Sequence, residues 1–173
     1  MVSEIATSLR SYREREAQLN KILLEDMPKN RSDIQAAKEF GDLSENFEYE
    51  TARNMERQLI TRMENLRREL ASAKIHDFDV DPDLSNGVTI GCRVTLAYDT
   101  GETRCIAILG AWDFDERLDI VSSRGSLAES LYGAQPGDTV SLPDPDFDGE
   151  YLEAVVQSVE PLTDEIRAWA RNA

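Results

Sequence analysis

The sequence predicts an α+β fold in two parts, an N-terminal antiparallel coiled coil of two helices and a C-terminal antiparallel sheet with one short helix. Two observations carry this prediction. Apolar residues recur at steps of three and four over residues 5–75, which is the spacing of a helical seam. From residue 88 onward, apolar and polar residues alternate between clusters of turn residues, which is typical of strands.

The first helical arm is predicted over residues 5–40. Pro28 lacks a backbone donor and disfavours helix for the residue before it. Ser32 and the three residues after it have the spacing of a capping box, which can restart a helix. We therefore expect a break or kink between about Asp26 and Ser32, followed by a second segment over residues 33–40. The apolar seam before the break is Ile5, Leu9, Tyr12, Leu19 and Leu23.

The second helical arm is predicted over residues 46–75, a length of about 45 Å at 1.5 Å per residue. Its seam is a heptad pattern with one extra residue, and a helix with so narrow an apolar stripe is stable only when it folds back on a partner. The opposite face carries a basic stripe interrupted by glutamates, for which i,i+4 ion pairing is one explanation. The seam is Ala52, Met55, Leu59, Met63, Leu66, Leu70 and Ala73, and the stripe is Arg53, Arg57, Arg62, Arg67 and Arg68.

The C-terminal half is predicted to be a small sheet domain. Turn chemistry at Asp99 to Glu102 and at Pro136 to Asp138 separates its strands. Ser126 can cap a short helix that Gly133 ends. The predicted strands cover residues 88–90, 93–98, 104–109, 117–122, 139–142 and 151–159, and the predicted helix covers residues 125–133.

These elements divide the chain into a coiled coil (1–76) with an acidic tip (39–50), a linker (77–87), a sheet domain (88–162) and a short helical tail (163–173). The net charge of −15 is uneven, because residues 1–77 hold 13 Lys and Arg against 15 Asp and Glu, while residues 78–173 hold 6 against 19. Nucleic acid attracts proteins through Lys and Arg, so a free duplex is not expected as the main partner.

The numbers of histidines and cysteines argue against several kinds of metal or catalytic site, and the hydropathy pattern argues against a membrane or secreted location. The one histidine, His76, rules out a site that needs two. Cys92 and Cys105 lack metal-ligand spacing and are expected to be reduced, partly buried thiols. The sequence has no apolar run of membrane-spanning length and no signal-peptide pattern at its N-terminus, so we expect a cytoplasmic protein that does not bind membranes.

The acidic tip is the candidate functional site. Its twelve residues contain five carboxylates (Glu39, Asp42, Glu45, Glu48 and Glu50) and no Lys or Arg. Asp42 and Glu45 have the spacing of a capping box for the second arm. The remaining carboxylates exceed what capping requires, and carboxylate oxygens are preferred ligands of Mg²⁺. Spacing alone does not decide between helix capping and Mg²⁺ binding as the role of Asp42 and Glu45.

The tip also resembles a known family. The string Gly41-Asp42-Leu43-Ser44-Glu45-Asn46-Phe47-Glu48-Tyr49, preceded by Ala36-Ala37-Lys38-Glu39 and followed by Ala52-Arg53, is similar to the tip motif of the bacterial Gre transcript-cleavage factors, GreA and GreB. The resemblance extends over nearly the whole chain and implies an FKBP-like C-terminal domain. Two aromatics depart from the pattern: Phe40 stands where His is common, and Phe47 where small residues are common.

The resemblance implies a transcription elongation factor that acts on backtracked or arrested RNA polymerase. The C-terminal domain would dock at the rim of the secondary channel, and the coiled coil would enter the channel and meet the extruded RNA 3′ end. Asp42 and Glu45 would hold a Mg²⁺ ion jointly with the polymerase and position the attacking water. The factor itself would be a monomer without catalytic activity of its own, with little binding to free nucleic acid.

The resemblance also implies supporting roles, each with an ordinary structural alternative. Tip-supporting roles fall to Gly41, Asn46, Glu48 and Tyr49, for which helix-end packing is the alternative. Lys38 and Arg53 could meet the RNA phosphate or could be solvated surface residues. Ser126, Leu127 and Ala128 stand where the family often has Ser-Pro-Ile-Ala, a polymerase-docking segment.

Three other functions compete with this expectation. A Gre-like paralogue would occupy the channel and inhibit the polymerase, although both tip acids match the activating pattern. A coiled-coil adaptor or holdase with an FKBP-like domain would need exposed apolar surface, which an acidic tip does not offer. A prolyl isomerase would need pocket aromatics that the C-terminal half lacks. Trp112 and Phe114 are expected in the core of that half.

Overall fold

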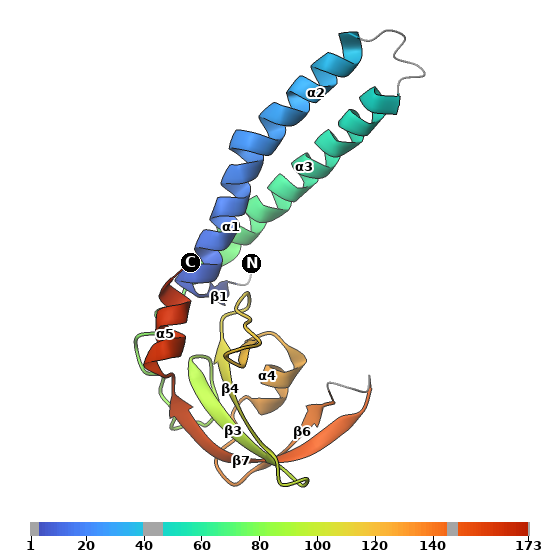
Figure 1. The fold of residues 1–173 in the computed structure, drawn as a ribbon. Coiled ribbons are helices and arrows are strands. Elements are labelled where there is room, and N and C mark those ends of the chain that lie inside the picture. Colours follow the sequence, from blue (N-terminus) through green and yellow to red (C-terminus); the bar gives the residue numbers. More distant parts are fainter. Residues whose placement is uncertain (1–3, 40–46, 145–148, 173) are drawn as a thin grey trace. The chain divides into compact units, whose positions relative to one another are not determined.

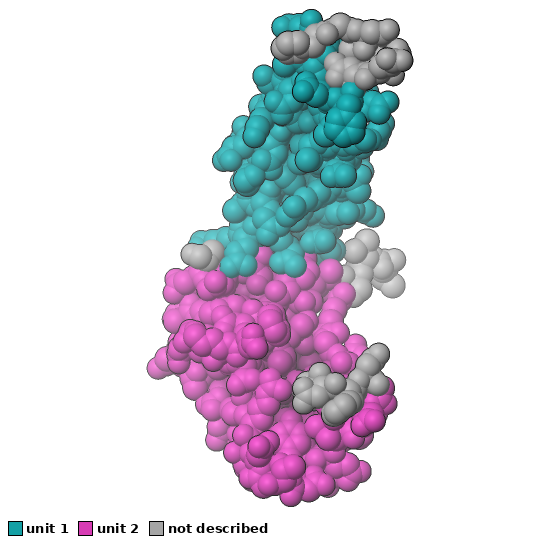
Figure 2. All heavy atoms as spheres, turned by 45° about the vertical axis from the view of Figure 1, so that its right-hand side comes forward, with its two compact units in different colours: residues 1–2, 12–73 teal, residues 3–11, 74–173 magenta. Residues whose placement is uncertain are grey.

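The computed structural model describes residues 4–39, 47–144 and 149–172. These residues form two compact units (Figure 2). The first unit comprises residues 12–73, and the second comprises residues 4–11 together with residues 74–172. The α+β class predicted from the sequence is confirmed, and each unit is described in turn.

The first unit is a helical hairpin, as predicted. Its first arm consists of α1 (Leu9–Lys21), a π-helical segment η1 (Ile22–Asp26) and α2 (Met27–Glu39). Its second arm is α3 (Phe47–Ser72), which runs beside α2 (Figure 1). None of the helices in the described part of the chain is long and apolar enough to span a lipid bilayer.

The predicted break between Asp26 and Ser32 is wrong, because the chain stays helical from Leu9 to Glu39. The irregularity lies one turn earlier, in the π-helical segment, where the Met27 amide donates to the Ile22 carbonyl five residues back. Pro28 follows directly after this wider turn, inside the continuous helix, where its missing amide leaves one main-chain bond of the helix unmade. Ser32 lies inside α2 and caps nothing.

The wider turn also moves the buried seam. Ile22, three residues after Leu19, is buried, whereas the predicted seam residue Leu23 is exposed; the extra residue of the π turn shifts the seam positions that follow, Asn30 and Ile34. Met55, another predicted seam residue, is 48% exposed. The buried residues between the arms are Ile22, Asn30, Ile34 and Ala37 from the first arm and Ala52 and Leu66 from the second.

The second unit is built on a five-stranded sheet in the order β5-β4-β3-β7-β6 (Figure 1). The pairs β4–β3, β3–β7 and β7–β6 are antiparallel, and β4–β5 is parallel, which the sequence did not predict. The strands are β3 (Cys92–Tyr98), β4 (Thr103–Leu109), β5 (Ile120–Ser122), β6 (Thr139–Pro143) and β7 (Tyr151–Pro161).

Two predicted strand segments are not strands. Val88 donates its amide to the Ala134 carbonyl and accepts from the Gly133 amide, so residues 88–90 bond to the loop after a helix instead of to the sheet. Residues 117–119 form a turn in which the Asp115 carboxylate accepts the Leu118 amide and Asp119 has a positive φ of 49°. Both segments have strand-like composition, but local hydrogen bonds take their backbone groups.

Helices cover both faces of this sheet. Side chains alternate along β4, so Ile106 and Ile108 join the core under α4 (Ser126–Leu131), whereas Ala107 and Leu109 join the core under α5 (Asp164–Arg171). The expectation of one packed helix is therefore wrong. The predicted tail supplies Ile166 and Ala170 to the second core, and the predicted linker supplies Phe78.

Residues 4–11 belong to the second unit, although their apolar spacing predicted coiled coil. Residues Ile5–Thr7 form β1, which pairs with β2 (Ala73–Ile75) in a small two-stranded sheet. The fully buried Asp113 holds this segment by accepting bonds from the Ser8 amide at 3.0 Å, the Ser8 hydroxyl at 2.5 Å and the Gly110 amide at 2.7 Å. The Ser8 hydroxyl accepts the Ser11 amide at 3.1 Å and so caps α1.

Asp113→Ala should lower the free energy of unfolding of the second unit by about 3 kcal/mol, because two buried amides and a hydroxyl lose their acceptor. Urea unfolding followed by the fluorescence of Trp112 and Trp169, which both lie in this unit, measures the change. Asp99→Ala, at an exposed turn, is the control and should stay within about 0.5 kcal/mol. Equal effects of the two substitutions would contradict the assigned role of Asp113.

The two thiols are free, and their surroundings predict different reactivity. Cys92 is fully buried, and this burial raises the pKa of its thiol, whereas Cys105 is half-buried and accepts a bond from Arg93 Nη2 at 3.2 Å. In native protein treated with iodoacetamide, Cys105 should be alkylated first and Cys92 only after unfolding. Peptide mass mapping distinguishes the sites, with Cys105→Ala as the control. Equal rates at both cysteines would refute this assignment.

Candidate functional site

The acidic tip connects the two arms of the hairpin. α2 ends at Glu39, and α3 begins at Phe47. The candidates Gly41, Asp42, Glu45 and Asn46, together with Phe40, lie outside the described residues. The structure therefore places the helix ends on either side of these candidates.

The two helix ends expose charge and one aromatic ring. Lys38 and Glu39 are exposed at the end of α2, where Gln35 Nε2 donates to the Glu39 carboxylate at 3.2 Å. Phe47 is 80% exposed, while Tyr49 is half-buried. Among the described positions, the tip is thus an accessible surface with little packing around its side chains.

The start of α3 favours negative charge. Glu48 and Glu50 lie in its first turn and are exposed. The free amides and the positive end of the helix dipole stabilise carboxylates at this position. Part of the repulsion within the acidic tip is therefore offset by the helix itself.

The basic residues of α3 have mainly neutral partners. Arg57 donates to Asn54, Arg68 donates to Asn65, and Arg62 donates to Gln18 at 3.4 Å. Arg53 differs, since it forms an ion pair with Glu56. The predicted i,i+4 ion pairs are thus not the contacts that these three arginines make in the described part of the chain.

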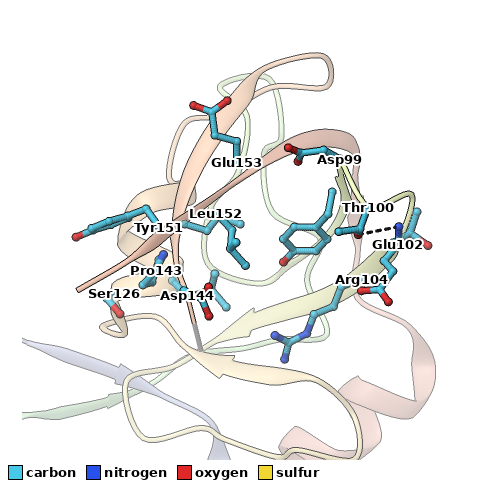
Figure 3. A pocket seen from close by; sticks show the side chains of 14 residues that line it. Asp99, Thr100, Glu102, Arg104, Ser126, Pro143, Asp144, Tyr151, Leu152 and Glu153 are labelled. Atoms are coloured by element: carbon cyan, nitrogen blue, oxygen red, sulfur yellow. Dashed lines mark hydrogen bonds between the residues drawn. The ribbon is translucent and has the colours of Figure 1, made fainter. Parts of the chain in front are cut away.

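A second candidate site is a groove in the second unit, with a volume of about 1270 Å³ (Figure 3). Its lining comes from the start of α4, the hairpin between β3 and β4, and the facing ends of β6 and β7. Leu152 lies between Tyr151, Ser126 and Asp144 at one end and Asp99, Glu102 and Arg104 at the other (Figure 3). The apolar lining residues are Tyr98, Leu127, Leu142, Pro143, Tyr151 and Leu152.

The rim of this groove is acidic. Asp99, Glu102, Asp144 and Glu153 line it, and Arg104 is the one basic lining residue among those the structure describes. Arg104 is already paired with Asp119 at 2.7 Å. A ligand that buries apolar surface here would therefore meet a negative field at the rim.

The predicted docking residues divide between this groove and the core. Ser126 and Leu127 line the groove. Ala128 is fully buried among core side chains, so its predicted contact with a partner is wrong and its role is to seat α4 on the sheet. The next residues in the helix, Glu129 and Ser130, are exposed but do not line the groove.

Sequence reasoning missed the strand residues that complete the groove. Tyr151 is 65% exposed, and Leu152 and Glu153 follow it at the start of β7. Residues 151–153 were predicted only as strand, and the Tyr-Leu pair at the start of that strand was the one available signal in the sequence. Phe114 was predicted in the core but is 70% exposed.

In the described regions, the side chains that could bind a metal ion lie too far apart to form a site. Within residues 4–39, 47–144 and 149–172, no three His, Cys, Asp or Glu side chains gather closely enough to hold a metal ion. The tip residues 40–46 add two carboxylates, Asp42 and Glu45, whose hard oxygen atoms fit Mg²⁺ by donor chemistry.

Comparison with known families covers most of the chain. The family described as "Transcription elongation factor, N-terminal" matches residues 5–75. The family described as "Transcription elongation factor, GreA/GreB, C-term" matches residues 83–156. The two matches correspond to the hairpin with its flanking strands and to most of the sheet unit.

Individual relatives carry the name "Transcription elongation factor GreA". The protein of Orientia tsutsugamushi (strain Boryong) is 31% identical over 88% of this chain and 96% of its own length. That of Acidiphilium cryptum is 33% identical over 79% of this chain and 86% of its own length. That of Chlamydia trachomatis is 32% identical over 78% of this chain but only 18% of its own length.

The chain spans less than a fifth of several of these relatives, since the matches also cover only 18% of the Chlamydia pneumoniae protein and 17% of the Borreliella burgdorferi protein. Among solved structures, the GreA factor homolog 1 (Gfh1) protein of Thermus thermophilus is 20% identical over 91% of this chain and 99% of its own, with a TM-score of 0.39. On the two family matches and the full-length relatives, the chain belongs to the GreA/GreB family of transcription elongation factors.

Proposed function

We propose that this chain rescues backtracked or arrested bacterial RNA polymerase. The end of the hairpin would enter the secondary channel and stimulate cleavage of the RNA 3′ end by the polymerase's own active centre. The observation that carries the proposal is the pair Asp42 and Glu45, in a family-specific string, between the ends of two packed helices. The protein would act in the cytoplasm as a monomer.

The hairpin suits delivery of charge to an enclosed site. Its seam contains small residues near the tip, where Ala37 and Ala52 are buried, so the two arms stay narrow there. Lys38, Glu39, Glu48 and Glu50 are exposed on the flanks of the tip and leave the end of the hairpin polar. Apart from the exposed ring of Phe47, the described end of the hairpin is therefore polar, which suits a water-filled channel.

The tip carboxylates supply oxygen ligands and hydrogen-bond acceptors, and the polymerase supplies the remainder of the site. Mg²⁺ prefers six oxygen ligands, so two carboxylates fill only part of its shell. When bound, the ion would supply positive charge that activates water and stabilises the leaving oxygen. Asp42 and Glu45 would hold and orient that water from the side of the tip. The chain alone would therefore not be an enzyme.

The arginines of α3 fit contact with the extruded RNA. Arg57, Arg62 and Arg68 bond to neutral amides, so a phosphate can approach them without first displacing a carboxylate. Arg53 would have to leave Glu56 to make the same contact. Lys38 is exposed at the opposite helix end and needs no such exchange.

The groove of the second unit is the proposed docking surface for the polymerase. Leu127, Tyr151 and Leu152 offer apolar contacts, while Glu102 and Glu153 on the rim favour a basic neighbour. We infer that the docking segment of the polymerase presents an apolar anchor flanked by Lys or Arg. Such complementarity mainly affects the association rate and its salt dependence.

Replacing the tip acids tests the proposed function. With backtracked elongation complexes carrying labelled RNA, the wild-type protein should release short 3′ fragments. Asp42→Asn and Glu45→Gln should each reduce the maximal cleavage rate by about a hundredfold or more, because a preorganised charged ligand is lost while the side-chain shape is kept.

The matched control is Glu50→Gln, which removes an exposed carboxylate from the same tip region and should leave most of the rate. If Asp42→Asn and Glu45→Gln cleave as well as the wild type, these acids act as helix caps and the proposal fails. Polymerase binding that slows synthesis without fragment release would instead identify an inhibitory relative.

Reversing the charge of the groove rim tests the docking surface. Glu153→Lys should raise the protein concentration needed for half-maximal cleavage by about tenfold at low salt, with the maximal rate unchanged. Glu116→Lys makes the same charge change at an exposed position outside the groove and should have little effect. Indistinguishable titration curves for the two variants would exclude this rim from docking.

A further inference from the structure

A buried polar side chain interrupts the apolar seam of the hairpin. Asn30 is only 4% exposed, and its neighbours in the seam of α2 are Ile34 and Ala37. Its Nδ2 donates to the main-chain carbonyl of Ala52 in α3 at 2.9 Å. Its Oδ1 is buried without a hydrogen-bond partner among the described residues.

Such a residue is poorly suited to a purely stabilising role. An aliphatic side chain at this position would bury apolar surface and leave no polar atom unsatisfied. In helical coiled coils, a single buried Asn lowers stability but selects one register, because its hydrogen bond forms only when the partner group lies opposite. The bond from Asn30 to Ala52 has this directional character.

On the tip side of Ile34, the seam discriminates poorly between registers. Ala37 and Ala52 are both buried, and their small side chains offer little shape to resist an axial shift. Met55, which would follow Ala52 in the seam, is largely exposed. An axial shift of one residue moves a helix by about 1.5 Å, and a shift of one turn moves it by about 5.4 Å.

We propose that Asn30 is a positioning residue whose hydrogen bond to Ala52 holds α3 in a single register against α2. Asn30 lies nine residues before Glu39, and Ala52 lies five residues after Phe47. The bond thereby fixes the relative axial positions of the two helix ends from which the tip departs. The effect on cleavage rests on the proposed function, whereas the effect on register does not.

The test compares Asn30→Leu with Ile34→Ala in the full-length protein. Asn30→Leu should keep or raise the melting temperature of the hairpin, measured by circular dichroism, because it replaces a buried amide whose Oδ1 has no described partner by apolar volume. Its maximal cleavage rate should fall at least about tenfold, since ångström-scale misplacement of catalytic groups has effects of this size. The concentration for half-maximal cleavage should not change, because the second unit is intact.

Ile34→Ala is the matched control in the same helix. It should lower the melting temperature through the loss of a buried side chain but keep the maximal cleavage rate below that temperature, because the Asn30 bond remains. A lower melting temperature for Asn30→Leu, an unchanged maximal rate, or an equal rate loss in both variants would overturn the inference.

A readout without polymerase separates this inference from the proposed function. In nuclear magnetic resonance spectra, Asn30→Leu should give a second set of amide signals for residues 47–60 or altered contacts between α2 and α3. A single set with unchanged contacts would overturn the register role. If the wild-type protein failed to stimulate cleavage, the proposed function would fall, and these spectra would still decide the role of Asn30.

Discussion

The hairpin depends on burial of a narrow seam that neither arm can bury alone. Ile22, Ile34 and Leu66 are the large apolar side chains that this contact removes from water. Long isolated helices with mostly charged faces are marginal in water, so the arms are helical because they are paired. The same narrowness leaves the remaining faces polar, which allows the end of the hairpin to carry acids that a packed domain would have to pair or neutralise.

The second unit follows a different rule, because its sheet is covered on both faces. β4 alternates between the core beneath α4 and the core beneath α5, so both helices are part of one folded unit. The N-terminal segment is attached through Asp113, whose acceptor atoms satisfy amides that would otherwise be buried without partners. Gly110 is required beside it, since a Cβ there would lie 2.4 Å from Thr7 Cα.

The elements that the sequence predicted correctly are those whose residue pattern repeats over many positions. The helical period of the two arms and the alternation in β3, β4 and β7 each rest on several residues, so these elements were found. Features decided by one distant contact were missed. β1 has helical spacing, yet its pairing with β2 decides its conformation. The α5 helix with its Thr163 cap was predicted correctly, but its packing against the sheet was not.

Of the candidate site residues, those in one local stretch of sequence were predicted, and those brought together by the fold were not. Asp42 and Glu45 could be singled out because the string around them is local, whereas the groove assembles residues from α4, β6 and β7 that are far apart in the sequence. Asn30 was passed over for a related reason, because a polar residue in a seam becomes informative only when its partner is known to be a buried backbone carbonyl.

The two acidic regions place different demands on a partner. Glu48 and Glu50 lie in the first turn of α3, where the positive end of the helix dipole offsets part of the repulsion between carboxylates. The groove rim surrounds apolar side chains, so its charge acts on whatever segment approaches them. Because residues 78–173 carry 19 acidic against 6 basic residues, attraction to a basic surface should act mainly through this unit. Under the proposed function, substitutions in the groove and in the tip would therefore act on separate steps, because the groove attracts a partner and the tip supplies oxygen ligands.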